Sequence, residues 1–167
     1  VGPFEAYCDM DGGWTLIMKA TGAATLQYTS AYWTNTALLN QTDPDLSNAD
    51  AKYQGFIHLN VTDLRGCLDG HCFTKSFGGT QKTYEIFSGA ADVVSGHPGF
   101  GTSADWSTQP NCKHYGINTS WIYSRTRFGY TANQEPNCSS NDTAIGFGVG
   151  FHGGSGPAET NLGAGYN

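Results

Sequence analysis

Phe4-Glu5-Ala6-Tyr7-Cys8-Asp9-Met10-Asp11-Gly12-Gly13-Trp14-Thr15-Leu16-Ile17-Met18-Lys19 contains two short apolar runs on either side of an Asp-Gly-Gly turn. The first run covers Phe4 to Cys8 and the second covers Trp14 to Met18. Asp-Gly steps suit tight turns, and apolar runs flanking such a turn are typical of a β-hairpin. The sequence therefore predicts an N-terminal hairpin, with Trp14 and the more distant Trp33 packed in it or in the core.

Three further segments predict strands. Phe56-Ile57-His58-Leu59-Asn60-Val61 alternates with period two and is typical of a half-buried strand that continues toward Cys67. Arg127-Phe128-Gly129-Tyr130 and Ala144-Ile145-Gly146-Phe147-Gly148-Val149-Gly150 combine apolar residues with glycines. We expect the glycines to permit close backbone approach between these two strands.

Helix is expected to be scarce. The best candidate is Tyr84 to Val94, which ends before Gly96 to Pro98. Its apolar residues fall on one face of a helix, and they are Ile86, Phe87, Ala90, Val93 and Val94. The polar stretch from Thr34 to Ala51 shows turn residues without helical periodicity, so we expect a loop with one short helix there.

The length and charge of the chain restrict the number of domains and the classes of partner that we expect. The 167 residues fit one domain, 1–167, and carry 23 glycines with only 13% charged residues. A net charge of −6 with eight Lys plus Arg leaves little to neutralise a phosphate backbone, so we expect no nucleic-acid partner. No apolar stretch reaches the roughly 20 residues that span a bilayer, so we expect no membrane insertion.

The five cysteines favour disulfides over zinc, because they form no CxxC pair. Cys67 and Cys72 enclose a short, turn-like segment that a local bridge could close, which leaves Cys112 with Cys138 as the long bridge. Cys8 is then left over. It either bonds to Cys8 of a second subunit or is a buried free thiol.

The sequence also predicts a secreted protein. It contains five Asn-x-Ser/Thr candidates for N-glycosylation, which are Asn40, Asn60, Asn118, Asn137 and Asn141. It begins Val1-Gly2-Pro3 without an initiator Met, and we expect a processed mature chain. Disulfides and sequons together fit passage through an oxidising secretory route.

Three stretches together resemble the fibrinogen-related domain family, including its intelectin-like branch. The first is Pro3 to Ile17, where a Cys-Asp-Met stretch, a Gly pair and a Trp follow in that order. The second is Asn111-Cys112. The third runs from Arg127 through Asn133-Gln134-Glu135 and Asn137-Cys138 to Ile145-Gly146-Phe147-Gly148. The resemblance implies an α+β fold with a twisted, mostly antiparallel sheet, few short helices and long ordered loops.

The resemblance also implies a sugar-binding site. In lectins of this family an Asn-Cys step marks the pocket for the acetyl group, and it corresponds here to Asn111 and Cys112. We expect Cys112 and His114 to donate to the acetyl oxygen, and Trp106 with Tyr115 to form the apolar wall. Trp106, Tyr115 and Trp121 would serve equally well as core aromatics. Asn133, Gln134 and Glu135 would receive ring hydroxyls or form an ordinary solvated loop.

Calcium is not expected to be required. Calcium-binding members of the family carry an Asp-rich loop before the cysteine that corresponds to Cys112, whereas residues 101–110 offer only Asp105. A Ca²⁺ ion takes six to eight oxygen ligands, several of them usually from carboxylates. The site is therefore expected to be weakened or absent.

The function implied by the resemblance is a multivalent lectin for N-acetylated hexosamines or other acetylated glycans. Several weak sites on one homo-oligomer raise avidity by about 10²- to 10⁴-fold, which is the basis of agglutination and would suit innate defence. The alternative is an extracellular protein-interaction module of fibrinogen type. Catalysis is not expected, because the sequence contains no GxSxG or HExxH motif, and carboxylates such as Glu135 and Asp142 stand isolated.

Overall fold

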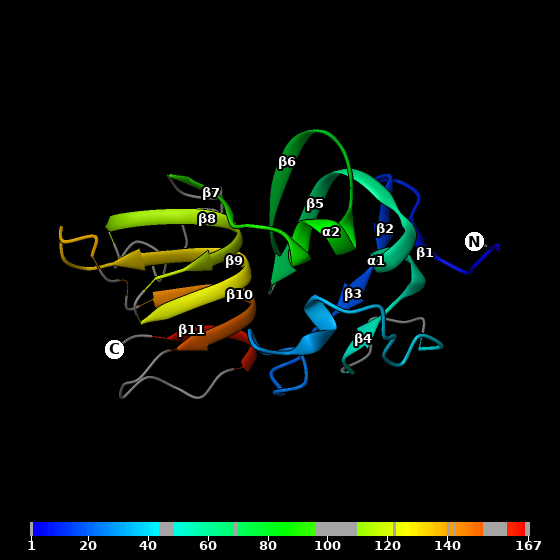
Figure 1. The fold of residues 1–167 in the computed structure, drawn as a ribbon, viewed down its shortest axis with the longest axis horizontal. Coiled ribbons are helices and arrows are strands. Elements are labelled where there is room, and N and C mark those ends of the chain that lie inside the picture. The colour runs from blue at the N-terminus through cyan, green and yellow to red at the C-terminus, as the bar shows by residue number, and fades with distance from the viewer. Residues whose placement is uncertain are drawn as a thin grey trace.

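One antiparallel sheet of five strands dominates the computed structural model, in the order β11-β10-β9-β8-β7 (Figure 1). The strands are β7 Asp92–Ser95, β8 Asn111–Ser120, β9 Ser124–Asn133, β10 Thr143–Phe151 and β11 Thr160–Gly165. The structure describes residues 2–43, 49–68, 70–95, 110–121, 123–139, 141, 143–151 and, for the backbone alone, 160–165.

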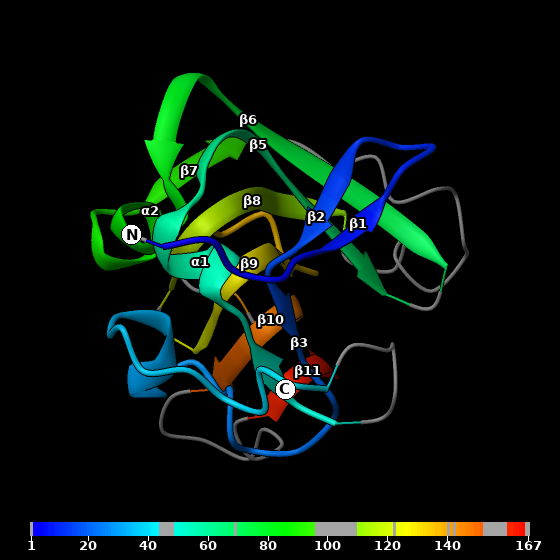
Figure 2. The same cartoon turned by 90° about the vertical axis from the view of Figure 1, so that its right-hand side faces the viewer.

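Three two-stranded antiparallel pairs and three short helices complete the described fold. The pairs are β1 Tyr7–Asp9 with β2 Trp14–Leu16, β3 Met18–Lys19 with β4 Ala51–Lys52, and β5 Asn60–Leu68 with β6 His71–Lys82. The helices are η1 Ala31–Trp33, α1 Gln54–His58 and α2 Thr83–Ser88. Figure 2 shows the long β5–β6 hairpin and the small β1–β2 hairpin from the side. The predicted small, β-rich α+β fold with few short helices is confirmed.

The N-terminal hairpin forms as predicted. Tyr7 pairs with Leu16, and Cys8 pairs with Thr15. The turn places Gly13 at a φ of +70°, which glycine adopts without steric cost, and its N–H donates to the Asp9 carbonyl at 2.8 Å. Trp14 is half-buried in this hairpin and Trp33 lies in the core, as expected.

The strand predicted over 56–61 is wrong at its first half. Residues 54–58 form α1, and β5 begins only at Asn60. Phe56 is fully buried, and its ring stacks on Phe87 with centroids 5.3 Å apart and 17° between the planes. Six residues of apolar alternation do not distinguish a strand from one helical turn, so tertiary packing of the Phe56 ring decides the conformation.

The helix predicted over 84–94 is half as long as expected. Ile86 and Phe87 are buried in α2 as predicted, but the helix ends at Ser88. Val93 and Val94 instead lie in β7, opposite Gly116 and Tyr115 of β8. β-branched residues favour strands, and pairing with the edge of the sheet outweighs the weak helical periodicity of this segment.

In its described part, the polar stretch 34–51 forms turns, with one isolated bridge between Leu39 and Lys52, except that its last residue, Ala51, begins β4. The expected short helix does not occur in 34–43 or 49–50, and residues 44–48 lie outside the described residues. A single 3-10 turn, η1, comes just before the stretch.

The core lies between the sheet and the helices. Its fully or nearly buried side chains come from every layer, and they are Leu26, Trp33, Phe56, Leu64, Phe73, Ile86, Phe87, Ile117, Phe128, Tyr130, Ala132 and Ile145. In Figure 1 the sheet occupies one end of the molecule and β1 to β4 with α1 the other, with α2 and the β5–β6 hairpin between them. Residues 134–139, in the loop between β9 and β10, are exposed.

Candidate functional site

Two disulfides form, and both pairings are those predicted. Cys67 and Cys72 face each other across the β5–β6 hairpin and close its turn. Cys112 at the start of β8 bonds to Cys138 in the loop after β9, with the Cα atoms 5.2 Å apart. The second bridge therefore fixes the loop 134–138 against the first residues of β8.

Amide groups hold the same loop. Asn111 and Asn133 are partners across β8 and β9, and Asn111 Nδ2 donates to the Gln134 carbonyl at 2.8 Å. Asn133 is almost fully buried; its Nδ2 donates to the Asn137 carbonyl at 2.9 Å, and its Oδ1 accepts from the Gln134 N–H at 3.1 Å. Of the three predicted loop residues, Asn133 shapes the loop, whereas Gln134 and Glu135 are exposed.

His114 and Trp121 form an aromatic pair beside this loop. Their ring centroids lie 4.8 Å apart with 38° between the planes, and both residues are half-buried. His114 Nδ1 lies 2.9 Å from the Cys112 carbonyl oxygen. A carbonyl can only accept, so Nδ1 carries the proton, and the neutral ring presents Nε2 as an acceptor. His114 thus offers an acceptor where the resemblance implied a donor.

The structure also limits the donor role that was expected for Cys112. Its sulfur is part of a disulfide and has no S–H to donate. Only the backbone N–H of Cys112 could donate to an acetyl oxygen. The residue has a φ of +54°, which marks a local distortion where β8 and β9 lose regular register between Asn111 and His114.

Tyr115 does not accompany His114. Neighbouring side chains in a strand point to opposite faces, and Tyr115 packs against the apolar core, opposite the buried Tyr130 of β9. This placement argues against Tyr115 as a wall of the same pocket. Trp106, the other expected wall residue, lies outside the described residues, as does Asp142.

Trp121 is the aromatic residue that sequence reasoning left unassigned. It lies seven residues after His114, which in a straight strand would be about 23 Å away. The ring contact requires β8 to bend, and Figure 1 shows β8 strongly curved. Gly116 with φ +145° and Asn118 with φ +52° lie between His114 and Trp121 in the sequence. Asn is enriched at positive φ, so Asn118 was the available signal for this bend.

We call Asn111, Cys112, His114, Trp121, Gln134, Glu135 and Cys138 the bridge site. It combines the half-buried His114–Trp121 pair with the exposed Gln134 and Glu135, whose loop is joined to β8 by the Cys112–Cys138 disulfide. Gln134 Nε2 donates to Glu135 Oε1 at 3.2 Å, so the two exposed side chains already point toward each other. Such a set can hold a ligand that has both an apolar face and hydroxyl groups.

The predicted sequons lie in different environments. Asn60 and Asn137 are exposed, and Asn40 is exposed while its Nδ2 donates to the Asp50 carbonyl at 2.8 Å. Asn118 and Asn141 are buried, and the Nδ2 atom of each donates two hydrogen bonds within the protein. A glycan on either buried residue would have to replace these bonds.

Cys8 is exposed on β1 and forms no disulfide within the described chain. Its sulfur lies 3.7 Å from Thr15 Oγ1 on the paired strand. The buried-thiol alternative is therefore wrong, and the bond to a second subunit stays a prediction.

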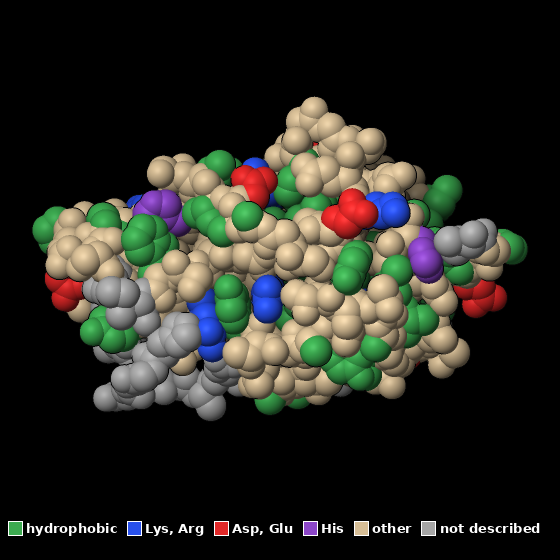
Figure 3. All heavy atoms as spheres, viewed as in Figure 1, with side chains coloured by type: hydrophobic (Ala, Val, Ile, Leu, Met, Phe, Trp, Pro, Cys, Tyr) green, Lys and Arg blue, Asp and Glu red, His purple; other side chains and the backbone are tan. Residues whose placement is uncertain are grey.

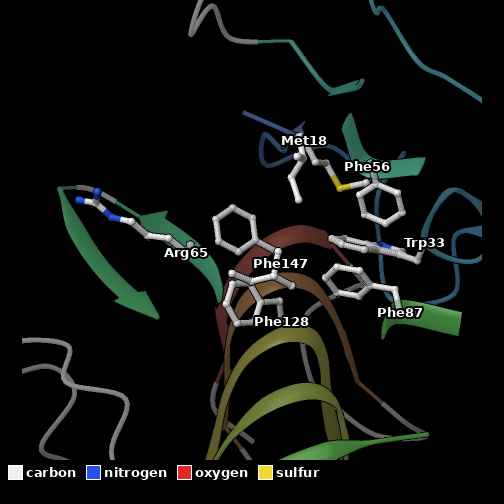
Figure 4. A pocket seen from close by; sticks show the side chains of 10 residues that line it. Met18, Trp33, Phe56, Arg65, Phe87, Phe128 and Phe147 are labelled. Carbon is white, nitrogen blue, oxygen red and sulfur yellow. The ribbon is translucent and has the colours of Figure 1, made fainter. Parts of the chain in front are cut away.

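An apolar pocket of about 60 Å³, partly open to solvent, lies away from the bridge site (Figure 4). Rings of Trp33, Phe56, Phe87, Phe128 and Phe147 surround it, while the guanidinium of Arg65 points away from them. Ligand pockets usually measure roughly 300 to 1,000 Å³, and sugar hydroxyls need polar partners that these rings lack. We assign this cavity to core packing.

Within the described residues, no group of three or more His, Cys, Asp or Glu side chains could hold a metal ion. Asp105 lies outside them, and the expectation of calcium-independent binding stays a prediction. None of the described helices has the length and apolarity that crossing a membrane requires. No family model, curated protein or solved structure matches the chain.

Proposed function

We propose that this protein is a secreted lectin that binds N-acetylated hexosamines at the bridge site without altering them. The observation that carries the proposal is the His114–Trp121 pair, half-exposed beside the loop that the Cys112–Cys138 disulfide anchors. The resemblance to fibrinogen-related lectins remains a prediction that agrees with this location.

Each part of the bridge site has a chemical task in this proposal. The Trp121 ring stacks on the C–H face of the sugar and removes apolar area from water. His114 Nε2 accepts a hydrogen bond from the acetamido N–H. Gln134 and Glu135 bind ring hydroxyls, and the Cys112 backbone N–H donates to the acetyl oxygen. No metal and no covalent step take part.

Multivalency would raise the strength of binding. A single exposed site of this size binds a monosaccharide weakly, and linking several sites raises avidity by about 10²- to 10⁴-fold. The exposed Cys8 on β1 offers one route to a covalent dimer. The proposal therefore includes a homo-oligomer that agglutinates glycan-bearing cells.

Calorimetric titration of N-acetylglucosamine and N-acetylgalactosamine into the protein, with and without EDTA, tests the proposal. Glucose, galactose and sodium acetate serve as comparison ligands. We expect both acetylated sugars to bind, EDTA to change nothing, and Trp121→Ala to weaken binding at least about 10-fold. The matched control is Tyr123→Ala, because Tyr123 is an exposed aromatic residue two positions away.

Three outcomes would contradict the proposal. Equal loss of binding in Tyr123→Ala would remove the specific role of Trp121. Release of a hydrolysed product from a labelled oligosaccharide would replace the lectin by an enzyme. Absence of glycan binding and of red-cell agglutination would favour the extracellular protein-interaction module.

A further inference from the structure

The Cys67–Cys72 disulfide lies at the surface of the β5–β6 hairpin, and a cation contacts one of its sulfurs. Cys67 and Cys72 are direct partners across the two strands, and Cys67 is exposed while Cys72 is half-buried. Arg65 Nη2 donates to Cys72 Sγ at 3.4 Å. Arg65 lies two residues before Cys67 in β5, so both side chains leave the same face of the hairpin, where a long side chain reaches its diagonal neighbour.

Arg65 is held by an aromatic ring and not by a carboxylate. Its guanidinium carbon lies 5.5 Å from the centre of the Trp14 ring in β2, a cation–π contact. The ion pairs recorded among the described residues all use lysines. Arg65 is exposed, and Figure 4 shows its guanidinium pointing away from the rings around the apolar pocket. The positive charge of Arg65 therefore acts on the Cys72 sulfur.

This cation is a local feature of a protein with few charges. The chain carries 13% charged residues and a net charge of −6. On the face drawn in Figure 3, charged side chains are few and lie among polar and hydrophobic ones. Exposed charges beyond a Debye length of about 8 Å are screened, so the charge on each sulfur is stabilised or destabilised by its immediate neighbours.

The other disulfide has different neighbours. Cys112 Sγ lies 3.8 Å from the Glu135 carbonyl oxygen, and Cys138 Sγ lies 3.7 Å from the Pro136 carbonyl oxygen. A carbonyl oxygen carries partial negative charge, which opposes the formation of a thiolate beside it. Cys138 is exposed, so accessibility alone does not distinguish the two bridges. They differ in the stability of the thiolate that each would release.

We propose that Cys67–Cys72 is a thiol–disulfide exchange site, which takes up an incoming thiolate at Cys67 and releases Cys72 as a thiolate. The incoming sulfur attacks the exposed Cys67 Sγ, a new S–S bond forms, and the Cys67–Cys72 bond breaks. Its electron pair stays on Cys72 Sγ, beside the Arg65 guanidinium. One disulfide forms for each one broken, so no oxidant is consumed. A cation beside a sulfur stabilises the thiolate, and a more stable thiolate leaves faster.

Two sources can supply the attacking thiolate. One is a low-molecular-weight thiol such as glutathione, which would remain attached to Cys67. The other is Cys8 of a second copy, because Cys8 is exposed on β1 and forms no disulfide within the described chain. Its attack would link two chains through Cys8 and Cys67. This link requires no oxidant, unlike a Cys8–Cys8 bond, and leaves Cys8 of the attacked copy free to react in turn.

Trapping of the exchange product tests the proposal. Cys8→Ser protein with both disulfides formed is incubated with glutathione, and the reaction is stopped at intervals by excess N-ethylmaleimide, which alkylates free thiols and prevents reclosure. Mass spectrometry of unreduced peptides then locates each group. We expect glutathione on Cys67, the maleimide on Cys72, and opening of Cys112–Cys138 at least about 10-fold slower. The second bridge is thus an internal control in the same molecule.

Arg65→Met keeps most of the apolar stem and removes the cation. We expect Cys67–Cys72 to open at least about 3-fold more slowly in this variant, with no change at Cys112–Cys138. Arg65→Lys restores the charge, and its rate should lie closer to that of the wild type. Sodium chloride should reduce the difference between the wild type and Arg65→Met, because salt screens an exposed charge and leaves packing unchanged.

Wild-type protein without glutathione distinguishes the two sources. A Cys8–Cys67 peptide and covalent oligomers on non-reducing electrophoresis would identify a second copy as the thiol, whereas a glutathione adduct without such oligomers would identify the small thiol. Attachment of glutathione to Cys72, equal opening of the two disulfides, or an unchanged rate in Arg65→Met would overturn the proposal. The attachment site is also read in protein that keeps Arg65, so the test does not depend on the Arg65 variants.

Discussion

Gly129 of β9 and Gly146 of β10 face each other in register so closely that neither position has room for a side chain. A Cβ atom on Gly146 would lie 2.6 Å from Gly129 Cα and 2.4 Å from the Phe128 carbonyl oxygen. The register extends this contact into a row of glycines across four neighbouring strands, Gly116, Gly129, Gly146 and Gly163. The row lets the strands approach closely where the sheet curves.

Replacing Gly146 by alanine should therefore disrupt the sheet. The new methyl group would meet backbone atoms that cannot move independently, at a φ of +145° that alanine rarely adopts. We expect the free energy of unfolding to fall by about 3 kcal/mol or more, as measured by urea denaturation.

Gly79→Ala is the control for this substitution, because a Cβ atom at Gly79 in β6 would meet nothing within 4 Å. Its stability should change by less than about 0.5 kcal/mol. Similar losses of stability in the two variants would mean that the close approach of β9 and β10 does not depend on glycine at position 146.

The sequence was informative where a local chemical constraint acts. The Asp11-Gly12-Gly13 turn predicted the first hairpin, and the glycines of residues 127–130 and 144–150 predicted closely approaching strands. Both disulfides followed from cysteine spacing alone. In each case the residues that decide the structure are near each other in the chain or belong to one chemical type.

The predictions from sequence were wrong where packing between residues far apart in the chain decides the local conformation. Phe56 turns a predicted strand into α1 because its ring stacks on Phe87, thirty-one positions away. At the bridge site, Asn111, Cys112, Gln134 and Glu135 were predicted from the family resemblance, and their role in binding stays a prediction. Trp121 was not assigned to the site, because its contact with His114 depends on the bend of β8. The periodicity of the sequence does not predict this bend.

The two disulfides should contribute unequally to stability and binding. They close loops with sequence separations of 26 for Cys112–Cys138 and 5 for Cys67–Cys72, and chain entropy gives about 3.5 and 2 kcal/mol, respectively. Chemical denaturation of the two double alanine variants, Cys112→Ala with Cys138→Ala and Cys67→Ala with Cys72→Ala, measures this difference.

The same two variants should also differ in their affinity for sugar. Loss of Cys112–Cys138 frees the loop with Gln134 and Glu135, so we expect at least about 10-fold weaker binding of N-acetylglucosamine. The Cys67–Cys72 variant should bind as the wild type does. Unchanged affinity without Cys112–Cys138 would place the sugar elsewhere on the molecule.

Glycan occupancy should follow the burial of the five sequons. When the protein is expressed through a eukaryotic secretory pathway, we expect glycans on Asn60 and Asn137, whose side chains are exposed. Asn118 should stay unmodified, because it donates to the Phe87 and Gly89 carbonyls and accepts from Arg127. Peptide mass spectrometry with and without glycosidase treatment checks each site, and a fully occupied Asn118 would contradict the fold around it.

Stability should rise with pH through the titration of Lys52. Lys52 is fully buried, and its Nζ donates to the Tyr32 carbonyl at 2.5 Å and the Asn35 carbonyl at 2.6 Å. Burial lowers its pKa from 10.5 to about 8, so between these values the unfolded chain binds more protons than the folded one. The free energy of unfolding then increases with pH, by at most about 1.4 kcal/mol per pH unit.

Urea denaturation between pH 7.5 and 9.5 measures this slope, best in a Cys8→Ser background that prevents disulfide exchange by the exposed thiol. Buried Tyr130, whose pKa is raised to about 12, opposes the trend only above pH 10, where unfolded tyrosines begin to ionise. Lys52→Met keeps the volume of the side chain and removes the charge, so its stability should be lower but nearly independent of pH in this range. A wild-type stability that stays flat or falls toward pH 9.5 would show that the carbonyl oxygens around Nζ stabilise the ammonium form enough to cancel the effect of burial.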